Sequence, residues 1–181
     1  MDRLYRADLE LHDRPTDGFE EGSIDDTVFR DAMRRVVTAV HIVTSDGLEG
    51  RAGLTASAVA SVSDRPPTVL VCLNGESQSA ARLIANGVFC INTLGAGDEE
   101  IAATFAGLTE LPPHRRFERG RWERLSTGSP VLATSLACFD CRLTDVRRVA
   151  THDVILGEVL AVRCGRNAPA LAYFDRSYRT L

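Results

Sequence analysis

Hydroxyl-bearing and small apolar side chains alternate along residues 54–63, and this pattern is the part of the sequence best suited to hold a ligand. Every second residue from Leu54 to Val62 is apolar, and the positions between them include Thr55, Ser57, Ser61 and Ser63. Strict alternation predicts one strand with a core face and an open face. Because the core face is mostly alanine, a flat ligand would lie close to the backbone while hydroxyl groups bond its polar edge. Serine and threonine are also ordinary on the wet side of a half-buried strand, and alternation alone does not separate the two interpretations.

The segments that follow are expected to bring further polar groups near this strand. Asp64-Arg65-Pro66-Pro67 breaks the strand, and residues 68–73 are a continuous apolar run of strand length. Asn74-Gly75 is a turn signal, and Ser77 is a suitable N-cap for a helix over residues 77–86. A helix N-terminus that carries Ser77 and Ser79 is a reasonable place for an anion.

Few other side chains offer chemistry of their own. His41 lies in an apolar strand and is predicted to be structural, whereas His152, beside Asp153 at a strand start, is equally a ligand contact or a turn residue. Cys138 and Cys141 form a CxxC, but residues three apart in a strand point to opposite faces, so no shared metal ion or disulfide is expected. The sequence contains no GxSxG, HExxH, paired-carboxylate or GxGxxG motif.

The composition is that of one soluble globular domain. The chain has 181 residues, 44% of them hydrophobic and 25% charged, with a formal net charge of −4. This charge gives no general attraction to nucleic acid or to an anionic membrane. All 21 basic residues are arginine, which excludes Schiff-base and P-loop lysine chemistry. With no membrane-spanning apolar run, no secretory signal and five scattered cysteines, we expect reduced thiols and a cytoplasmic location.

Mainly β structure with a few helices is expected along the chain. Residues 1–23 form an N-terminal extension, disordered or packed on a partner, and a short helix follows from Asp25 or Asp26. The basic loop 107–128 is interpreted as solvated or as a subunit contact rather than as a phosphate site. Without a βαβ rhythm, the pattern favours an antiparallel barrel whose ends are covered by helices, with strands near residues 37–44, 54–62, 68–73, 88–94, 132–146, 151–164 and 171–174 and helices over 77–86 and 98–105.

Several of these segments, in this order, resemble the flavin reductase-like family of FMN-binding split-barrel proteins, which reduce flavin for two-component monooxygenases. The resemblance covers residues 28–181 and within the family is strongest to the reductases of pyrimidine breakdown and of 4-hydroxyphenylacetate hydroxylation. It is carried by Gly53–Ala58, Ser61-Val62-Ser63, Pro66-Pro67, Val69–Asn74, Phe89–Leu94, Phe105-Ala106-Gly107, Arg116-Phe117, Gly128–Leu132, Thr151-His152-Asp153, Gly157-Glu158-Val159 and Tyr173–Tyr178.

The resemblance implies a six-stranded antiparallel Greek-key split barrel over residues 24–181, which works as a homodimer. FMN or FAD would contact Leu54, Thr55, Ala56, Ser57, Ser61, Val62, Cys72, Leu73, Asn74, Ser77, Phe105 and Ala106. NADH or NADPH would contact His152, Arg176, Ser177 and Tyr178. Since Glu76 stands where some relatives have a basic residue, an arginine such as Arg51 or Arg82 would meet the flavin phosphate.

Direct hydride transfer between two bound cofactors needs no protein nucleophile, so no catalytic side chain and no metal ion are expected. The predicted function is an NAD(P)H:flavin oxidoreductase that supplies a monooxygenase by diffusion, without nucleic-acid or membrane partners. One alternative is a flavoprotein that retains FMN and reduces another acceptor such as ferric iron. Another is a non-catalytic flavin- or haem-binding protein on the same barrel.

Overall fold

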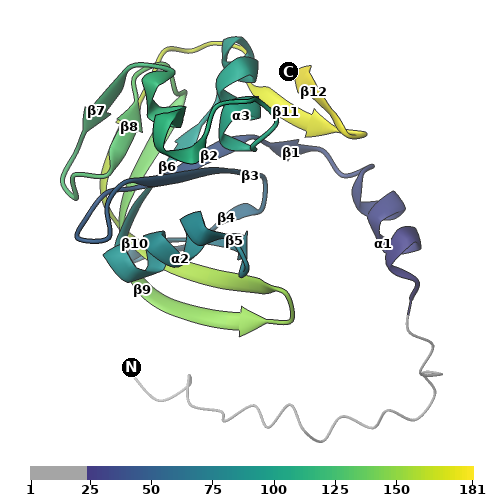
Figure 1. Ribbon diagram of the computed structural model, residues 1–181, viewed down its shortest axis with the longest axis horizontal. Coiled ribbons are helices and arrows are strands. Elements are labelled where there is room, and N and C mark those ends of the chain that lie inside the picture. The colour runs from purple at the N-terminus through teal and green to yellow at the C-terminus, as the bar shows by residue number, and fades with distance from the viewer. Residues whose placement is uncertain (1–23) are drawn as a thin grey trace, which may run out of the picture. The chain divides into compact units, whose positions relative to one another are not determined.

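A computed structural model of the chain describes residues 24–181 (Figure 1). The extension predicted for residues 1–23 lies outside the described residues. The chain divides into two units, residues 1–33 and 34–181. Helix α1 (Asp26–Met33) belongs to the first unit, and the carboxylate of Asp25 accepts a hydrogen bond from the backbone N–H of Thr27 at its start, 2.7 Å long.

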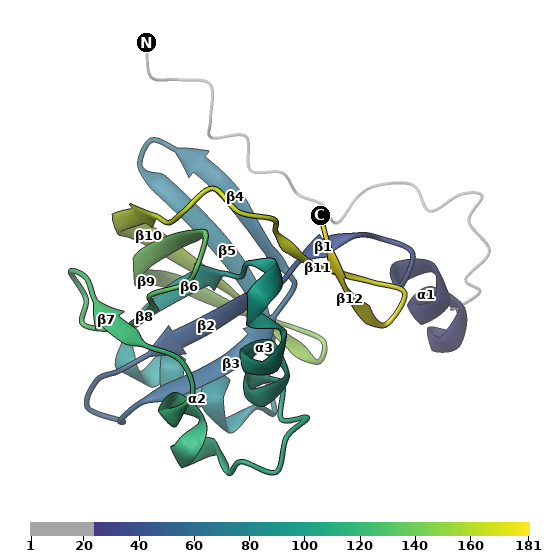
Figure 2. The ribbon, with the colours of Figure 1, turned by 90° about the horizontal axis from the view of Figure 1, so that it is seen from above.

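The second unit is mainly β, and every strand pair in it is antiparallel. Its largest sheet is strongly curled (Figure 2) and runs in the order β3 (Ala52–Ala56), β2 (His41–Ser45), β6 (Val88–Thr93), β9 (Ala137–Val149), β10 (His152–Cys164), β5 (Pro67–Asn74) and β4 (Val59–Asp64). The smaller sheets contain β1 (Thr38–Ala39), β11 (Leu171–Phe174) and β12 (Ser177–Thr180), and β7 (Trp122–Arg124) with β8 (Pro130–Leu132).

Two helices pack against β3, namely α2 (Gln78–Asn86) and α3 (Glu99–Phe105). Two 3-10 helices, η2 (Ala96–Asp98) and η3 (Pro113–Glu118), flank α3 in sequence. The Ser77 hydroxyl caps α2 by accepting from the Ala80 N–H at 3.4 Å, and Gly87 ends it in the left-handed region at φ 69°, as expected of a helix C-cap. No helix within residues 24–181 is long and apolar enough to cross a membrane.

The single strand predicted for residues 54–62 is wrong, because the chain changes partners in the middle. β3 pairs with β2 at one edge of the sheet, while β4 pairs with β5 at the other edge. Between them, the Val59 N–H donates to the carbonyl of Ser57 at 3.2 Å. This kink shifts the alternation, so that Val59 packs on the core while Ala60 and Val62 are exposed. Counted as one bent strand that joins both edges, β3 and β4 give the six strands of the predicted split barrel.

Two other strand predictions need correction at turns. The strand predicted for residues 132–146 is interrupted, because the Ser135 hydroxyl and N–H both donate to the Leu132 carbonyl, at 2.6 and 3.2 Å. The final hairpin was predicted only as far as residue 174. Asp175 and Arg176 have φ of 48° and 59°, the mirror-image turn that joins two-residue hairpins, and β12 follows. The turn was not predicted because Asp175 and Arg176 stand where such turns usually contain glycine.

The buried side chains form separate clusters on the two faces of the sheet. The larger cluster contains Phe89, Leu83 and Cys141, and a second contains Phe105, Ile42 and Leu171. Cys138 lies in a third cluster with Cys90. The prediction that Cys138 and Cys141 point to opposite faces is therefore confirmed, and both are free thiols.

Candidate functional site

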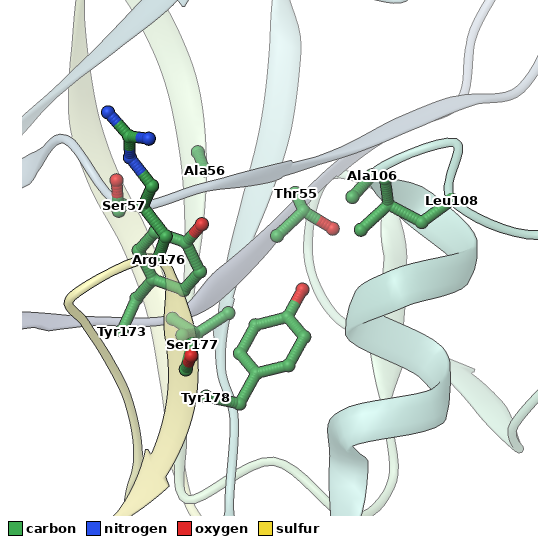
Figure 3. A pocket seen from close by; sticks show the side chains of 10 residues that line it. Thr55, Ala56, Ser57, Ala106, Leu108, Tyr173, Arg176, Ser177 and Tyr178 are labelled. Atoms are coloured by element: carbon green, nitrogen blue, oxygen red, sulfur yellow. The ribbon is translucent and has the colours of Figure 1, made fainter.

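The kink between β3 and β4 borders two adjoining pockets. The first, here called the barrel pocket, has a volume of about 420 Å³ and is lined by Leu54, Thr55, Ala56, Ser57, Ala58, Cys72, Leu73, Asn74, Ser77, Ser79, Phe105, Ala106, Arg116 and His152. The second, here called the hairpin pocket (Figure 3), has a volume of about 340 Å³ and is lined by Val40, Thr55, Ala56, Ser57, Ala106, Leu108, Tyr173, Arg176, Ser177 and Tyr178. Four residues, Thr55, Ala56, Ser57 and Ala106, are common to both, so the two pockets adjoin.

Most of the residues predicted from the sequence come together here. Ten of the twelve predicted flavin contacts line the barrel pocket, and four of those ten belong to the wall that it shares with the hairpin pocket. Ser61 and Val62 line neither pocket, because they lie on exposed parts of β4 beyond the kink. Arg176, Ser177 and Tyr178 line the hairpin pocket, as a group. His152 lines the barrel pocket, away from the three residues with which it was grouped.

The shared wall is held in place from behind by α3. A Cβ atom at Gly53 would lie 2.6 Å from the Phe105 ring, so glycine at this position lets the ring pack against β3. Phe105 in turn contacts Phe117 and Trp122 edge-on, with ring centroids 5.0 and 5.5 Å away. The Thr55 hydroxyl donates to the Ala102 carbonyl at 2.7 Å. Its proton therefore ties β3 to α3, and only its lone pairs remain for a ligand.

Arg116 is the feature of the barrel pocket that the sequence interpretation missed. The loop 107–128 carries five arginines, and four pair with carboxylates: Arg115 with Glu118, Arg119 with Glu100, Arg121 with Glu123, and Arg124 with Asp46. Arg116 makes no ion pair within residues 24–181, and its Nε atom is buried without a hydrogen-bond partner there. An unneutralised guanidinium beside Ser77 and Ser79, at the start of α2, is suited to a phosphate.

The two arginines first expected to meet the phosphate lie next to the barrel pocket but do not line it. Arg51 and Arg82 line a separate cavity of about 710 Å³ that meets the barrel pocket at Ser77 and Ser79. Arg51 pairs with Asp46 at 3.4 Å, and Arg82 donates to the Arg51 carbonyl at 3.3 Å. The charge pattern did not indicate which arginine of the loop 107–128 has no ion pair within residues 24–181, since that depends on the fold of the loop.

The remaining titratable groups differ in role. His41 is buried, with its Nδ1 3.2 Å from the Thr93 hydroxyl, and burial lowers its pKa to about 4, so it is a neutral structural residue as predicted. Burial, with smaller effects of Tyr173 and Glu99, raises the pKa of Tyr178. Its phenol is therefore protonated at neutral pH and can donate to a ligand. Within residues 24–181, no group of three or more metal-binding side chains is gathered.

Comparison with known proteins identifies the family. Residues 33–181 match the model of the flavin reductase like domain. The chain belongs to the flavin reductase-like family.

Individual flavin reductases are similar over nearly the whole chain. An FMN reductase (NADH), RutF 1, of Methylorubrum extorquens strain PA1 is 50% identical over 88% of this chain and 78% of the relative. The crystal structure of a putative flavin reductase from Haemophilus somnus is 38% identical, with a TM-score of 0.83, over 87% of this chain and 100% of that one. BorF, the flavin reductase component of a bacterial two-component tryptophan halogenase, is 28% identical with a TM-score of 0.79, over 87% and 98%.

Proposed function

We propose that this chain transfers a hydride from NADH to FMN and releases the reduced flavin to a separate monooxygenase. The observation that carries the proposal is the pair of pockets that adjoin across Thr55, Ala56, Ser57 and Ala106. Hydride transfer requires two planar rings in contact at near-attack distance, and two pockets with a common wall of small residues provide that arrangement. The choice of NADH and FMN is supported by the Methylorubrum extorquens relative, whose name is FMN reductase (NADH).

The barrel pocket suits the flavin. Its isoalloxazine would lie along Leu54 to Ser57, where alanine and serine allow close approach to the backbone, and its ribityl chain would pass Asn74. Its phosphate would meet Arg116 and the serines at the start of α2, an arrangement in which a cation and backbone N–H groups bind the same anion. When bound, the flavin supplies the hydride acceptor.

The hairpin pocket suits the nicotinamide nucleotide. Figure 3 shows Tyr178 and Arg176 reaching from the hairpin towards Thr55 and Ser57, with Ala106 and Leu108 on the other side. The phenol of Tyr178 offers a donor and the guanidinium of Arg176 offers a cation to a phosphorylated ligand. The protein binds and orients the two rings and excludes water between them. The hydride step requires no proton transfer from a side chain.

The protomer is proposed to work as a homodimer. The barrel exposes apolar side chains at Val62, Leu160 and Val162, with exposed fractions of 50%, 44% and 54%. In the other unit, α1 exposes Val28 and Phe29. A second copy of the chain that covered these side chains would remove their apolar surface from water. Sedimentation equilibrium tests the proposal: a mass twice that of the chain is expected, and a monomer at micromolar concentration contradicts it.

Counting the flavin reduced without oxygen tests the proposed function. With a small amount of protein, excess NADH and a large excess of FMN, we expect many equivalents of FMN to lose their visible absorbance per protomer. A single equivalent would indicate retained flavin and favour the alternative in which another acceptor is reduced. FMN binding without any loss of absorbance would favour the non-catalytic alternative.

A further inference from the structure

We propose that Arg148 and Asp153, which line neither pocket, are positioning residues for the barrel pocket. Their ion pair fixes the turn formed by residues 74–77 against the β9–β10 hairpin, so that Asn74, Ser77 and His152 face the flavin together. The inference rests on the proposed binding of flavin in this pocket. It assigns a role to a polar cluster beside the site rather than to a ligand contact.

The ion pair is bidentate, and only one of its two side chains is buried. Arg148 Nε lies 2.7 Å from Asp153 Oδ1, and Nη2 lies 3.2 Å from Oδ2. The Asp153 side chain is only 8% exposed, whereas that of Arg148 is 54% exposed. Within residues 24–181, Arg148 supplies the only side-chain hydrogen bonds to this carboxylate, so its loss would leave a buried charge unpaired. The two residues are also cross-strand partners in the hairpin.

The same guanidinium rests on the turn that precedes α2. Arg148 Nη2 donates to the Gly75 carbonyl at 3.4 Å, and the Gly75 N–H donates to the Thr151 carbonyl at 3.0 Å. A Cβ atom at Gly75 would lie 2.2 Å from the Arg148 guanidinium carbon, so glycine is what admits this contact. The turn is thus tied to the β9–β10 hairpin through both the N–H and the carbonyl group of Gly75.

The residues on either side of this cluster are those that line the pocket. Asn74 precedes Gly75 and is the cross-strand partner of His152, which precedes Asp153. The Asn74 side chain closes the turn by accepting from the Glu76 N–H at 2.9 Å, and the Asn74 carbonyl accepts from the Ser77 N–H at 3.0 Å. A shift of the turn would therefore move Asn74, Ser77 and the start of α2 as one piece. Displacements of about 1 Å at such positions cost large factors in binding and rate.

A matched control lies on the same two strands. Arg142 and Glu158 are also cross-strand partners on β9 and β10, with a 2.7 Å ion pair, but neither lines a pocket nor contacts the turn. The test compares Arg148→Ala and Asp153→Asn with Arg142→Ala. The readouts are the Kd for FMN from flavin fluorescence, amide hydrogen exchange at residues 75–77, and the melting temperature.

For Arg148→Ala and Asp153→Asn we expect the FMN Kd to rise about tenfold and exchange at residues 75–77 to accelerate, with neither change in Arg142→Ala. Arg148→Lys, which keeps the charge but not the bidentate geometry, should recover part of the affinity. A fall in melting temperature with an unchanged FMN Kd would overturn the proposal. If Arg148→Ala does not fold, Asp153→Asn and Arg148→Lys decide in the same way.

Gly75→Ala provides an independent test, because its methyl group would displace the guanidinium. In the native background we expect Gly75→Ala to weaken FMN binding, but in the Arg148→Ala background to add little, since the contact is already lost. Fully additive effects would overturn the proposal. FMN binding is measured without NADH, so a protein that binds FMN but oxidises no NADH would refute the proposed function while the positioning role is still decided. Absence of FMN binding would overturn both.

Discussion

The two pockets share a wall but are built from different parts of the fold. The barrel pocket lies between β3, β5 and the start of α2, where hydrogen bonds hold Thr55 and Ser77 and aromatic packing holds Phe105. The hairpin pocket depends on β11 and β12, whose connecting residues Asp175 and Arg176 adopt left-handed φ values, and on Tyr173, which is 39% exposed. We therefore expect substitutions in the β11–β12 hairpin to change the hairpin pocket without moving the walls of the barrel pocket.

Arg116→Ala should have the largest effect on one pocket alone. Loss of a charge-assisted contact to phosphate, about 2 kcal/mol, should raise the Kd for FMN about 30-fold. Riboflavin lacks the phosphate, and its Kd should be unchanged. Fluorescence titration with both flavins measures the two values.

Arg115→Ala is the matched control for this substitution, because Arg115 pairs with Glu118 and lines neither pocket. It should leave both flavin affinities unchanged. Equal losses for FMN and riboflavin in Arg116→Ala would show that Arg116 supports the pocket walls instead of the phosphate.

Acid should weaken the fold through His41, whose cross-strand partner Ala56 lies in the wall common to both pockets. The pKa of His41 is about 4 in the folded chain, below its ordinary 6.5, so the unfolded chain binds the proton first as pH falls. The free energy of unfolding therefore does not depend on His41 above pH 6.5 and falls as the pH is lowered towards 4, by about 1.4 kcal/mol at about pH 5.5. Urea unfolding above pH 6.5 and at about pH 5.5 measures this loss, and His41→Gln should make the free energy of unfolding depend less on pH. An equally steep dependence in His41→Gln would refute the assignment.

Tyr178→Phe should affect only the hairpin pocket. Without the phenol donor, about 1 kcal/mol of binding is lost and KM for NADH should rise about fivefold at an unchanged FMN Kd. Steady-state kinetics at saturating FMN measure the change. Arg179→Ala, one residue along β12 and outside both pockets, is the control. A weaker FMN affinity in Tyr178→Phe would contradict the division between the pockets.

His152→Ala should have the smallest effect, and its direction separates two assignments. The family resemblance placed His152 with the nicotinamide nucleotide, whereas the structure places it in the barrel pocket only. We therefore expect a rise of about threefold in the FMN Kd, the size of one exposed hydrogen bond, with KM for NADH unchanged. The opposite result would return His152 to the nicotinamide site.

Local signals in the sequence predicted the elements that depend on local physics. Ser77 as the cap of α2, the apolar run of β5 and the opposed cysteines of β9 follow from capping, strand length and side-chain direction. The break between β3 and β4 was not predictable, because alternation does not say which neighbour each half of a strand pairs with. The hairpin at Asp175-Arg176 lacked the usual turn residues.

The residues of the candidate site on β3 and on the β11–β12 hairpin were predicted, but its arginine was not. Leu54 to Ser57 and Arg176 to Tyr178 were expected from the family resemblance, and in the structure they line the two adjoining pockets. Arg116 was missed because the loop 107–128 mixes five arginines with three glutamates, and only the folded loop shows which arginine has no carboxylate partner within residues 24–181. The cytoplasmic location and the absence of nucleic-acid partners stay predictions.

Steady-state oxidation of NADH by the pure protein, titrated with FMN and followed by the loss of NADH absorbance, tests the central claim most directly. We expect a rate that is near zero without added flavin and saturates with FMN. In Arg116→Ala, about 30-fold more FMN should be needed to reach the same maximum rate. An NADH oxidation rate that does not depend on FMN at any concentration would contradict it.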